Sequence, residues 1–317
     1  MRAVRFVDGK ARVVDAEATV PEYATDPVTV HVKSCSICGS DLHLLSWGLP
    51  CTVGHEFAGL LDDGTPVAVQ PYVPCGVCDQ CVIGETARCR VWLDRFHGVS
   101  IDGGLADTVI VDRACLALLP PEVPIENAAL TEPLAVTVRA ANNAGLTGAR
   151  AGDGPVLVIG GGSIGLAMTA VLKHRGYHVD VAARHDAQRA AAELLGAGLT
   201  PIDEYTVVVD AAGTQGAVDE AIVRLAPGGT LAVVATYWDP VQIGFSLLSK
   251  EATIVPSSIY GLRNGRREFD DAVDVLAANP VIAEVLVTHR FSLDDAPEAF
   301  ATAGNRAAGA IKVIIQP

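Results

Sequence analysis

The feature that most restricts the fold of this sequence is a short apolar run that ends in a cluster of glycines. Residues 156–159 are valine, leucine or isoleucine, and the residues that follow read Gly-Gly-Gly-Ser-Ile-Gly. They fit the pattern G-x-G-x-x-G, in which the first glycine permits a sharp turn and the second lets a pyrophosphate approach the backbone; the third lets helix and strand pack closely. A helix pattern continues to Arg175, so we expect the phosphates of a dinucleotide at its N-terminus. The residues that would surround these phosphates are Gly160, Gly162, Ser163, Ile164 and Gly165.

Strand-like and helix-like segments alternate around this turn, which is the context that a dinucleotide-binding motif requires. The predicted elements after the turn and its helix are a strand at 178–183, a helix at 187–195, a strand at 206–209, a helix at 217–225 and a strand at 231–235. This alternation predicts a doubly wound, parallel sheet with helices on both faces. The uncharged run 154–172 is long enough for a membrane helix, but its proline and glycines favour a strand, a tight turn and a helix instead.

The rest of the chain has a different character. Residues before Pro120 contain short β-like runs separated by turn residues, with few helix-period segments, and the tail from about 261 returns to mixed character. A chain of 317 residues is about twice the usual length of one domain. We therefore expect a β-rich domain over 1–122, an inserted doubly wound domain over 123–260, and a return to the first domain over 261–317.

Composition narrows the classes of partner. Half of the residues are hydrophobic, which suits packed cores, and the formal net charge is −14. Such an acidic surface repels nucleic-acid backbones and anionic lipid, so we expect neither nucleic acid nor membrane as a partner. The residues after Met1 show no secretory pattern, which favours a cytoplasmic location.

Four cysteines are spaced as in a metal-binding lobe. Cys75, Cys78, Cys81 and Cys89 can supply four thiolates from one loop. Zinc is satisfied by four sulfurs in a tetrahedron, and a closed site of this kind stabilises a loop rather than activating a substrate. Four unrelated buried cysteines and an iron–sulfur cluster are the weaker alternatives.

A second set of potential ligands is spread over three segments. Cys38 precedes His55 and Glu56, and Glu132 comes much later. A catalytic zinc takes three protein ligands from separated segments and keeps one position open, which a cysteine, a histidine and one glutamate can provide. Asp41 is then a natural acceptor for the second nitrogen of the ligand imidazole.

These motifs occur in an order that resembles the zinc-dependent medium-chain alcohol and polyol dehydrogenases. The resemblance rests on Cys38-Gly-Ser-Asp-Leu-His43, Gly54-His-Glu56, the four-cysteine lobe, Glu132-Pro-Leu-Ala and the glycine-rich turn. It covers essentially the whole chain. It implies an α/β protein with a GroES-like β-barrel catalytic domain and a Rossmann domain between its two segments. It also implies a homodimer or homotetramer built through the Rossmann domain.

The resemblance assigns roles residue by residue. It implies that Cys38, His55 and Glu132 bind the catalytic zinc, and that Glu56 approaches the metal when its coordination changes. Ser40 and His43 match the hydroxyl and the imidazole of a proton relay. Two departures concern the pocket: Gly39 stands where some members carry a basic residue, and the stretch 43–55 is short.

The activity implied is that of an alcohol dehydrogenase or carbonyl reductase with two zinc ions per chain. Zinc would polarise the oxygen of a small alcohol, aldehyde or ketone, and hydride would move between the substrate carbon and nicotinamide. Ser40 would take the alcohol proton and pass it through the nicotinamide ribose towards His43 and solvent. A zinc-free quinone or enoyl reductase and a non-catalytic zinc protein are the alternatives. Trp47, Trp92 and Tyr260 are candidate pocket walls, equally compatible with ordinary packing.

The end of the second predicted strand of the sheet indicates the cofactor. An acidic residue there would accept hydrogen bonds from an adenosine ribose hydroxyl and repel a 2′-phosphate. The residues present are Arg184 and His185, with Arg189 about one helical turn further on, whereas Asp180 lies mid-strand. An arginine can bind phosphate oxygens with two parallel hydrogen bonds, so we expect NADP(H) in preference to NAD(H). A solvated arginine on a loop is the alternative.

Overall fold

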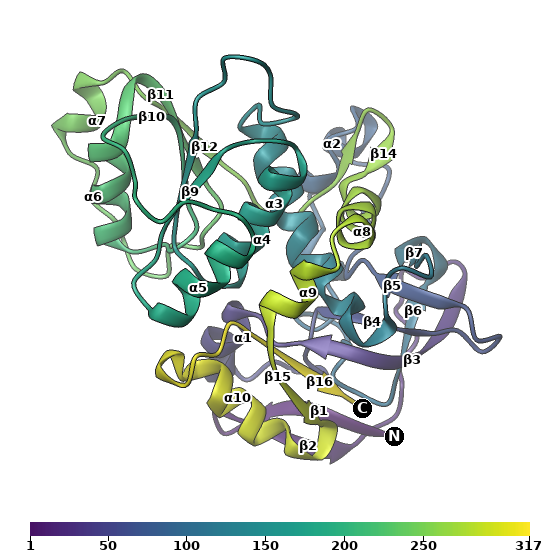
Figure 1. Cartoon of the computed structure of the whole chain (residues 1–317). Coiled ribbons are helices and arrows are strands. Elements are labelled where there is room, and N and C mark those ends of the chain that lie inside the picture. Colours follow the sequence, from purple (N-terminus) through teal and green to yellow (C-terminus); the bar gives the residue numbers. More distant parts are fainter. The chain divides into compact units, whose positions relative to one another are not determined.

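The structure is a computed structural model that describes the backbone of residues 1–317 and every side chain except that of Arg306. The chain divides into two compact units. The first unit comprises Met1–Glu132, Gly261–Ala283 and Val287–Pro317, and the second comprises Pro133–Tyr260 and Glu284–Leu286 (Figure 1). The chain therefore leaves the first unit after Glu132, ten residues beyond the expected boundary at 122. It re-enters the first unit at Gly261, the expected boundary.

The first unit is built on β-sheet. Its strands are β1 (Arg2–Val7), β2 (Lys10–Asp15), β3 (Pro27–Ser36), β4 (Glu56–Leu60), β5 (Pro66–Val69), β6 (Thr108–Asp112), β7 (Leu116–Leu118), β13 (Leu262–Arg263), β14 (Arg266–Arg267), β15 (Val287–Ser292) and β16 (Lys312–Gln316). Seven of them form one sheet in the order β15-β16-β3-β4-β5-β7, with β6 also paired to β3. All of these pairs are antiparallel except β15–β16. Apolar and polar residues alternate over 28–32 in β3, and Val30 and Val32 are buried in the core.

Helices of the first unit are short. They are α1 (Gly39–Leu44), α2 (Asp79–Val82), α8 (Glu268–Ala278), α9 (Val281–Leu286), which extends into the second unit, and α10 (Ala296–Gly304). Single turns of 3-10 helix occur at Leu45–Trp47, Thr86–Arg88, Leu93–Arg95, Arg113–Cys115, Ile125–Leu130, Leu293–Asp295 and Arg306–Ala308. Most of these turns shape the loops between strands, and those loops carry the residues of the site.

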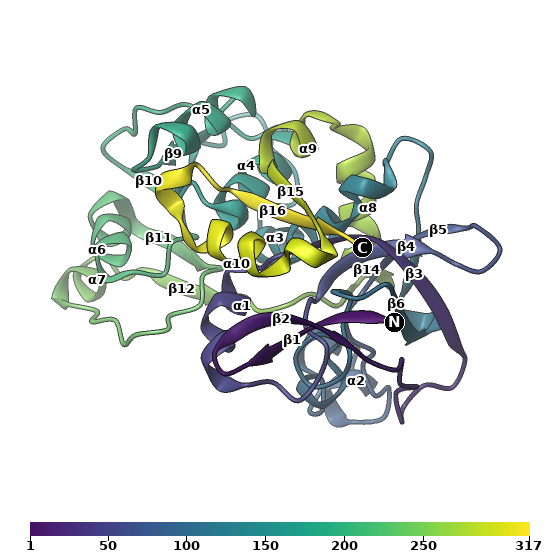
Figure 2. The same ribbon diagram turned by 90° about the horizontal axis from the view of Figure 1, so that it is seen from below.

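The C-terminal segment completes the core of the first unit. In Figure 2, α10 lies beside the β1–β2 hairpin, which comes from the other end of the chain. The rings of Phe6 and Phe300 meet edge to face with centroids 5.4 Å apart, a favourable geometry for an aromatic pair. Six residues of this segment share one hydrophobic cluster with residues of β1 and β3: Leu293, Ala296, Ala299, Phe300, Val313 and Ile315. The C-terminal segment therefore packs into the core of the first unit.

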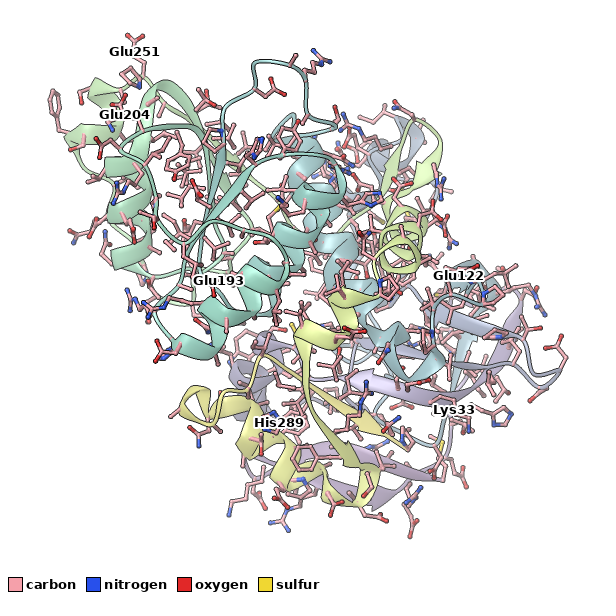
Figure 3. The ribbon with its side chains drawn as sticks, in the orientation of Figure 1. Lys33, Glu122, Glu193, Glu204, Glu251 and His289 are labelled. Atoms are coloured by element: carbon pink, nitrogen blue, oxygen red, sulfur yellow. The ribbon has the colours of Figure 1, made fainter. Side chains whose placement is uncertain are left out.

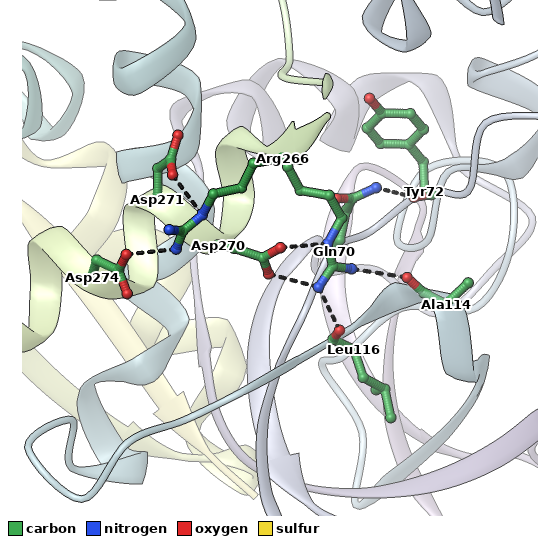
Figure 4. A network of polar contacts seen from close by, with 9 residues as sticks. Gln70, Tyr72, Ala114, Leu116, Arg266, Asp270, Asp271 and Asp274 are labelled. Carbon is green, nitrogen blue, oxygen red and sulfur yellow. Dashed lines mark hydrogen bonds and ion pairs between the residues drawn. The ribbon is translucent and has the colours of Figure 1, made fainter. Parts of the chain in front are cut away.

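Arginines at the start of α8 attach the returning chain to the sheet (Figure 4). Arg267 forms an ion pair with Asp270 (2.6 Å) and donates to the carbonyl oxygens of Ala114 (2.9 Å) and Leu116 (2.7 Å). Arg266 pairs with two aspartates of α8 at 2.8 and 2.5 Å. The acidic N-terminal half of α8 is thus neutralised by the residues that precede it, and Arg267 links it to the loop before β7 and to β7.

The second unit is a parallel sheet with helices. Its elements are α3 (Thr131–Asn143, which begins in the first unit), β8 (Val156–Ile159), α4 (Ser163–His174), β9 (Val179–Ala182), α5 (Asp186–Leu194), β10 (Tyr205–Asp210), α6 (Gln215–Arg224), β11 (Leu225–Val233), α7 (Phe245–Ser249) and β12 (Thr253–Pro256). The strand order is β12-β11-β10-β8-β9, and every pair is parallel. The predicted doubly wound parallel sheet is confirmed.

This sheet is shorter than the six-stranded order common to dinucleotide-binding folds. After α5 the chain reaches β10 with only an isolated bridge between Asp180 and Gly198. That bridge lies beside β9, where a further strand would pair. The sheet therefore has five strands, and β9 forms one of its edges.

The uncharged run 154–172 forms β8, the glycine turn and most of α4. The prediction of a strand, a turn and a helix in this run is confirmed. Among the described residues, no helix combines the length and the apolar character needed to cross a membrane.

Acidic side chains are distributed over the outside of the chain, and Glu122, Glu193, Glu204 and Glu251 are exposed examples (Figure 3).

Candidate active site

Asp41 organises the first set of ligands. Helix α1 begins after Cys38, whose backbone N–H donates to Asp41 Oδ2 over 2.9 Å. Asp41 Oδ1 lies 3.3 Å from Nδ1 of His55, and both side chains are buried. One carboxylate therefore fixes the residue at the helix start and lies against Nδ1 of the imidazole, without a hydrogen bond between Oδ1 and Nδ1. This side of the ring faces Asp41, which leaves Nε2 of His55 for a ligand role.

The donor atoms around His55 suit zinc. Cys38, His55 and Glu56 each offer one ligand atom, and these atoms lie within 4.8 Å of one another. Burial lowers the pKa of His55, but the negative charges of Asp41 and Cys38 outweigh it and raise the pKa well above its ordinary value. The same negative surroundings favour a metal cation at the ring. A sulfur, a nitrogen and a carboxylate oxygen are the ligand types that catalytic zinc takes.

Glu56 is held by a buried lysine. Nζ of Lys312 lies 2.9 and 2.8 Å from the two carboxylate oxygens of Glu56 and 3.3 Å from the carbonyl oxygen of Ile37. The hydroxyl of Ser36 donates to the same carboxylate. Burial lowers the pKa of Lys312, but the negative charges of Glu56, Cys38 and Glu132 raise it above the ordinary value. Both oxygens of Glu56 are therefore engaged within the protein.

Glu132 lies outside the cluster formed by Cys38, His55 and Glu56. It occupies the first turn of α3 and is buried, with 5% of its surface exposed. Its charge acts on Lys312, so it shares the buried charged neighbourhood of the site. Of the two glutamates expected here, the structure brings Glu56 rather than Glu132 next to Cys38 and His55.

The two residues of the expected proton relay lie on α1. Ser40 is half-buried, and His43 is exposed in the last turn of the helix. Because they are three residues apart on one helix, they lie on neighbouring positions of its surface. This arrangement runs from half-buried Ser40 towards solvent at His43.

Aromatic side chains surround the histidine. The ring of Phe96 lies 5.8 Å from that of His55, centroid to centroid. Tyr72 stacks on Phe96 at 6.0 Å, and Trp92 contacts Phe96 edge-on at 5.5 Å. Trp92 therefore belongs to an aromatic cluster beside the site, whereas Trp47 is 67% exposed and Tyr260 is buried.

The four cysteines of the predicted lobe are together. The ligand atoms of Cys75, Cys78, Cys81 and Cys89 lie within 4.8 Å of one another. Backbone N–H groups of Arg90 and Cys81 lower the pKa of Cys78 to about 6, which favours its thiolate. Four sulfurs from one loop are the donor set of a closed zinc site.

The lobe contacts the chain where it returns from the second unit. The hydroxyl of Thr86 accepts a hydrogen bond from the backbone N–H of Leu262 (3.0 Å). A Cβ added at Gly261 would lie 2.7 Å from the backbone nitrogen of Ala87, so only glycine fits there. The buried carboxylate of Glu268 accepts from the backbone N–H of Gly261 (2.9 Å). The lobe and α8 together hold the return segment.

In the second unit the glycine turn has the geometry that its sequence predicts. Gly160 has a φ of +107°, and a Cβ at Gly165 would overlap the carbonyl oxygen of Gly160. At Gly162, the residue before α4, an added Cβ would meet nothing within 4 Å. The open space at Gly162 and the N-terminus of α4, where Ser163 and Ile164 begin the helix, fit a pyrophosphate.

Arginine is exposed at the end of β9. Arg184 lies just after the strand, and a Cβ added at Gly216 would lie 3.3 Å from its Nη2. His185 is the N-cap residue of α5, and Arg189 pairs with Asp186 over 2.9 Å at the surface. Asp180 instead accepts a hydrogen bond from the hydroxyl of Tyr205 (2.6 Å).

The sequence reasoning did not identify Lys312, Ser36 or Phe96. A signal for Lys312 was present, because it is the one charged residue in the strand-like run 311–315. A lone lysine in a buried strand requires a buried partner. No comparable signal distinguishes Ser36 or Phe96, whose importance depends on which residues the fold places beside them.

Comparison with known proteins identifies the family of this chain. Residues 24–121 match the alcohol dehydrogenase GroES-like domain, and residues 125–316 match the glucose dehydrogenase C-terminus. L-arabinitol 4-dehydrogenase of Aureobasidium melanogenum is 29% identical over 94% of this chain and 89% of that protein. Two solved structures, each with a TM-score of 0.86, cover 100% of this chain and 99% of their own. One, described as a zinc-binding dehydrogenase of Sinorhizobium meliloti 1021, is 28% identical and holds NADP; the other, the alcohol dehydrogenase RspB of Escherichia coli CFT073, is 26% identical and holds NADH.

The chain belongs to the zinc-type medium-chain alcohol and polyol dehydrogenases. It is an oxidoreductase of the α/β class with a GroES-like domain and a Rossmann-like parallel sheet, as the resemblance implied.

Proposed function

We propose that this protein is a zinc-dependent alcohol dehydrogenase or carbonyl reductase that uses NADP(H). The first unit would be its catalytic domain and the second its dinucleotide-binding domain. The observation that supports the metal chemistry best is the buried contact of Asp41 with His55, 3.3 Å, next to Cys38. A carboxylate that orients a histidine in this way is the usual companion of a ligated imidazole.

The catalytic zinc would be held by Cys38, His55 and Glu132. Glu56 lies nearer to Cys38 and His55, but both of its oxygens are occupied by Lys312, and its charge is already balanced. Glu132 is buried, and its negative charge acts on Lys312. Glu56 would then stand beside the metal as a reserve ligand. The second zinc would be held by the four-cysteine lobe.

The protein residues would manage the proton. When bound, zinc would act as a Lewis acid that stabilises negative charge on the substrate oxygen. NADP(H) would supply the carbon that gives or receives hydride. The hydroxyl of half-buried Ser40 would accept the proton of the alcohol, and exposed His43 would release it to solvent. Asp41 would keep the imidazole of His55 in one orientation throughout.

The aromatic cluster beside His55 favours an alcohol or carbonyl compound with an apolar group. Phe96 and Trp92 offer apolar surface next to the ligand histidine. A panel of primary, secondary, aromatic and polyol substrates would test this preference. Turnover of sugars or polyols alone would contradict it.

From the family resemblance we also propose a homodimer or homotetramer. A light-scattering mass equal to that of one chain, 32.9 kDa, would contradict that assembly.

The experiment that tests the function combines metal content with turnover. The purified enzyme should contain two zinc ions per chain, and a chelator should remove the one at Cys38 first, with loss of activity before unfolding, because that site keeps an exchangeable position. Cys38→Ser and Glu132→Gln should each lose this zinc and activity while still binding NADPH; Glu56→Gln should keep the zinc. Full turnover by verified metal-free enzyme would overturn the proposal.

Cofactor preference depends on Arg184. Replacing it with aspartate removes a donor to the 2′-phosphate and adds repulsion, so kcat/KM for NADP should fall about 10- to 100-fold, the equivalent of one charged hydrogen bond. The value for NAD should change little or rise. Arg150→Asp, at another exposed position of the second unit, is the charge-matched control and should leave the ratio unchanged. A wild-type enzyme that prefers NAD would refute the assignment.

A further inference from the structure

Three loops meet at the carboxyl edge of the parallel sheet. They follow β8, β10 and β11. In the sheet, β10 lies between β8 and β11 and pairs with both. A Cβ added at Gly160, in the loop after β8, would lie 3.1 Å from Ala212, in the loop after β10. A Cβ added at Gly213 would lie 2.8 Å from the carbonyl oxygen of Thr236, in the loop after β11. The glycine turn and the two other loops therefore form one continuous surface.

A buried aspartate joins the second and third loops. Asp210, the last residue of β10, is fully buried. Its Oδ1 accepts from the backbone N–H groups of Ala212 (2.9 Å) and Gly213 (3.0 Å), and its Oδ2 accepts from the hydroxyl of Tyr237 (2.9 Å). Its backbone oxygen accepts from the first two N–H groups after β11, at 3.0 and 3.1 Å. The same residue thus fixes the loop after β10 and the start of the segment after β11.

The segment that begins at Tyr237 is also fixed at its far end. It has no regular secondary structure before α7. The backbone N–H of Gln242 donates to Oε1 of Gln215 (2.7 Å), and Nε2 of Gln215 donates back to the carbonyl oxygen of Gln242 (3.0 Å). Residues 237–242 are therefore tied to β10 at one end and to α6 at the other.

The position of these loops indicates which part of the cofactor they face. In a doubly wound sheet the ligand lies across the carboxyl ends of the strands, where the chain changes direction. That point falls here between β8 and β10, because β9 lies on one side of β8 and β10, β11 and β12 lie on the other. With the pyrophosphate at the glycine turn and the adenosine half at Arg184, the nicotinamide half must extend over the loops after β10 and β11.

We propose that Asp210 and Tyr237 are positioning residues for the nicotinamide half of the cofactor. The inference rests on the proposed function, because it takes the dinucleotide as the ligand of the second unit. Asp210 sets the loop after β10 through two backbone N–H groups, and it sets the loop after β11 through Tyr237. Loss of the tyrosine hydroxyl would remove the side-chain hydrogen bond between the third loop and Asp210. The glycine turn and the Arg184 side of the sheet would stay in place.

The chain offers a matched control for this pair. Tyr205, at the start of β10, donates its hydroxyl to Asp180 over 2.6 Å in the same sheet. Burial, together with the nearby carboxylate, raises the pKa of Tyr205 and of Tyr237 above the ordinary value, so both hydroxyls keep their protons in any ordinary assay. The two pairs have the same chemistry, but only Tyr237 lies after the carboxyl end of a strand.

The test uses Tyr237→Phe and Tyr205→Phe in the full-length, zinc-loaded enzyme. Binding of NADPH and of 2′,5′-ADP, which contains only the adenosine half, is titrated by calorimetry. Tyr237→Phe should raise the Kd for NADPH about tenfold, the equivalent of one hydrogen bond, and leave the Kd for 2′,5′-ADP within twofold of wild type. Tyr205→Phe should leave both constants unchanged, whatever its effect on the melting temperature.

Two results would overturn the inference. One is a Tyr237→Phe enzyme that binds NADPH as tightly as wild type. The other is an equal weakening of NADPH and 2′,5′-ADP, which would indicate a general loss of structure rather than a position effect. Failure of the wild-type enzyme to bind either compound would instead refute the NADP(H) assignment itself, so the two failures are distinguishable.

Discussion

Lys312 is a charged residue in a strand whose neighbouring side chains are buried and apolar. Val313, Ile314 and Ile315 are each at most 1% exposed, and so is Lys312. Its three ammonium hydrogens are matched by three oxygens, two from Glu56 and one from Ile37. A buried ion pair of this kind adds little net stability, but separating its members is costly. Its effect at this site is to fix the carboxylate of Glu56 beside the ligand residues.

We predict that Lys312→Met lowers the free energy of unfolding by about 3–5 kcal/mol, because the carboxylate of Glu56 is left buried without its counter-charge. The double variant Glu56→Gln with Lys312→Met should recover most of this loss. Denaturant unfolding of the zinc-loaded enzyme measures both. Lys33→Met, at an exposed position of β3, is the control and should stay within about 0.5 kcal/mol of wild type. A single Lys312 variant as stable as the control would refute this account.

At the scale of elements, the four-cysteine lobe is a segment without a hydrophobic core of its own. Val77, Val82 and Ile83 are 81%, 73% and 69% exposed. In the proposed zinc site, sulfur ligands and a few polar contacts would hold the lobe in shape, and the energy of metal binding would become folding energy. Its contact with the return segment, through Thr86, also connects the lobe to the start of α8.

We predict that Thr86→Val costs about 1–3 kcal/mol, because the buried N–H of Leu262 loses its acceptor. Hydrogen exchange should accelerate at Leu262 and at the N-terminus of α8, while the strands of the second unit keep wild-type protection. Thr86→Ser retains the hydroxyl and should behave like wild type. Equal exchange in the valine and serine variants would show that this hydrogen bond does not hold the return segment.

At the scale of the whole molecule, local motifs could be predicted because their geometry depends on neighbours in sequence. The glycine turn requires Gly160 at a φ of +107° and a glycine at 165 against a carbonyl oxygen a few residues earlier. The four cysteines are brought together by one loop. Cys38 and Asp41 meet within a single helical turn. Such contacts form wherever the rest of the chain lies, so the sequence predicts them well.

Other features depend on residues far apart in the chain. Lys312 contacts Glu56 only because β16 pairs with β3 and β3 pairs with β4. The sequence of one strand does not determine the register of its pairing with another. The fifth strand of the parallel sheet was not predicted either, because β12 follows the short helix α7 and is defined by its pairing with β11. The site shows the same limit, since the fold placed Glu56 rather than Glu132 next to Cys38 and His55.

The sequence by itself therefore determined the class of protein, the glycine turn, the grouping of the four cysteines in one lobe, and the order of the segments. Only the tertiary structure decided which buried charges pair, which aromatic rings lie beside His55, and how Asp210 joins two loops of the cofactor edge. The physical reason is the same in each case. Spacing along the chain fixes local geometry, whereas strand register and burial decide which distant side chains share one environment.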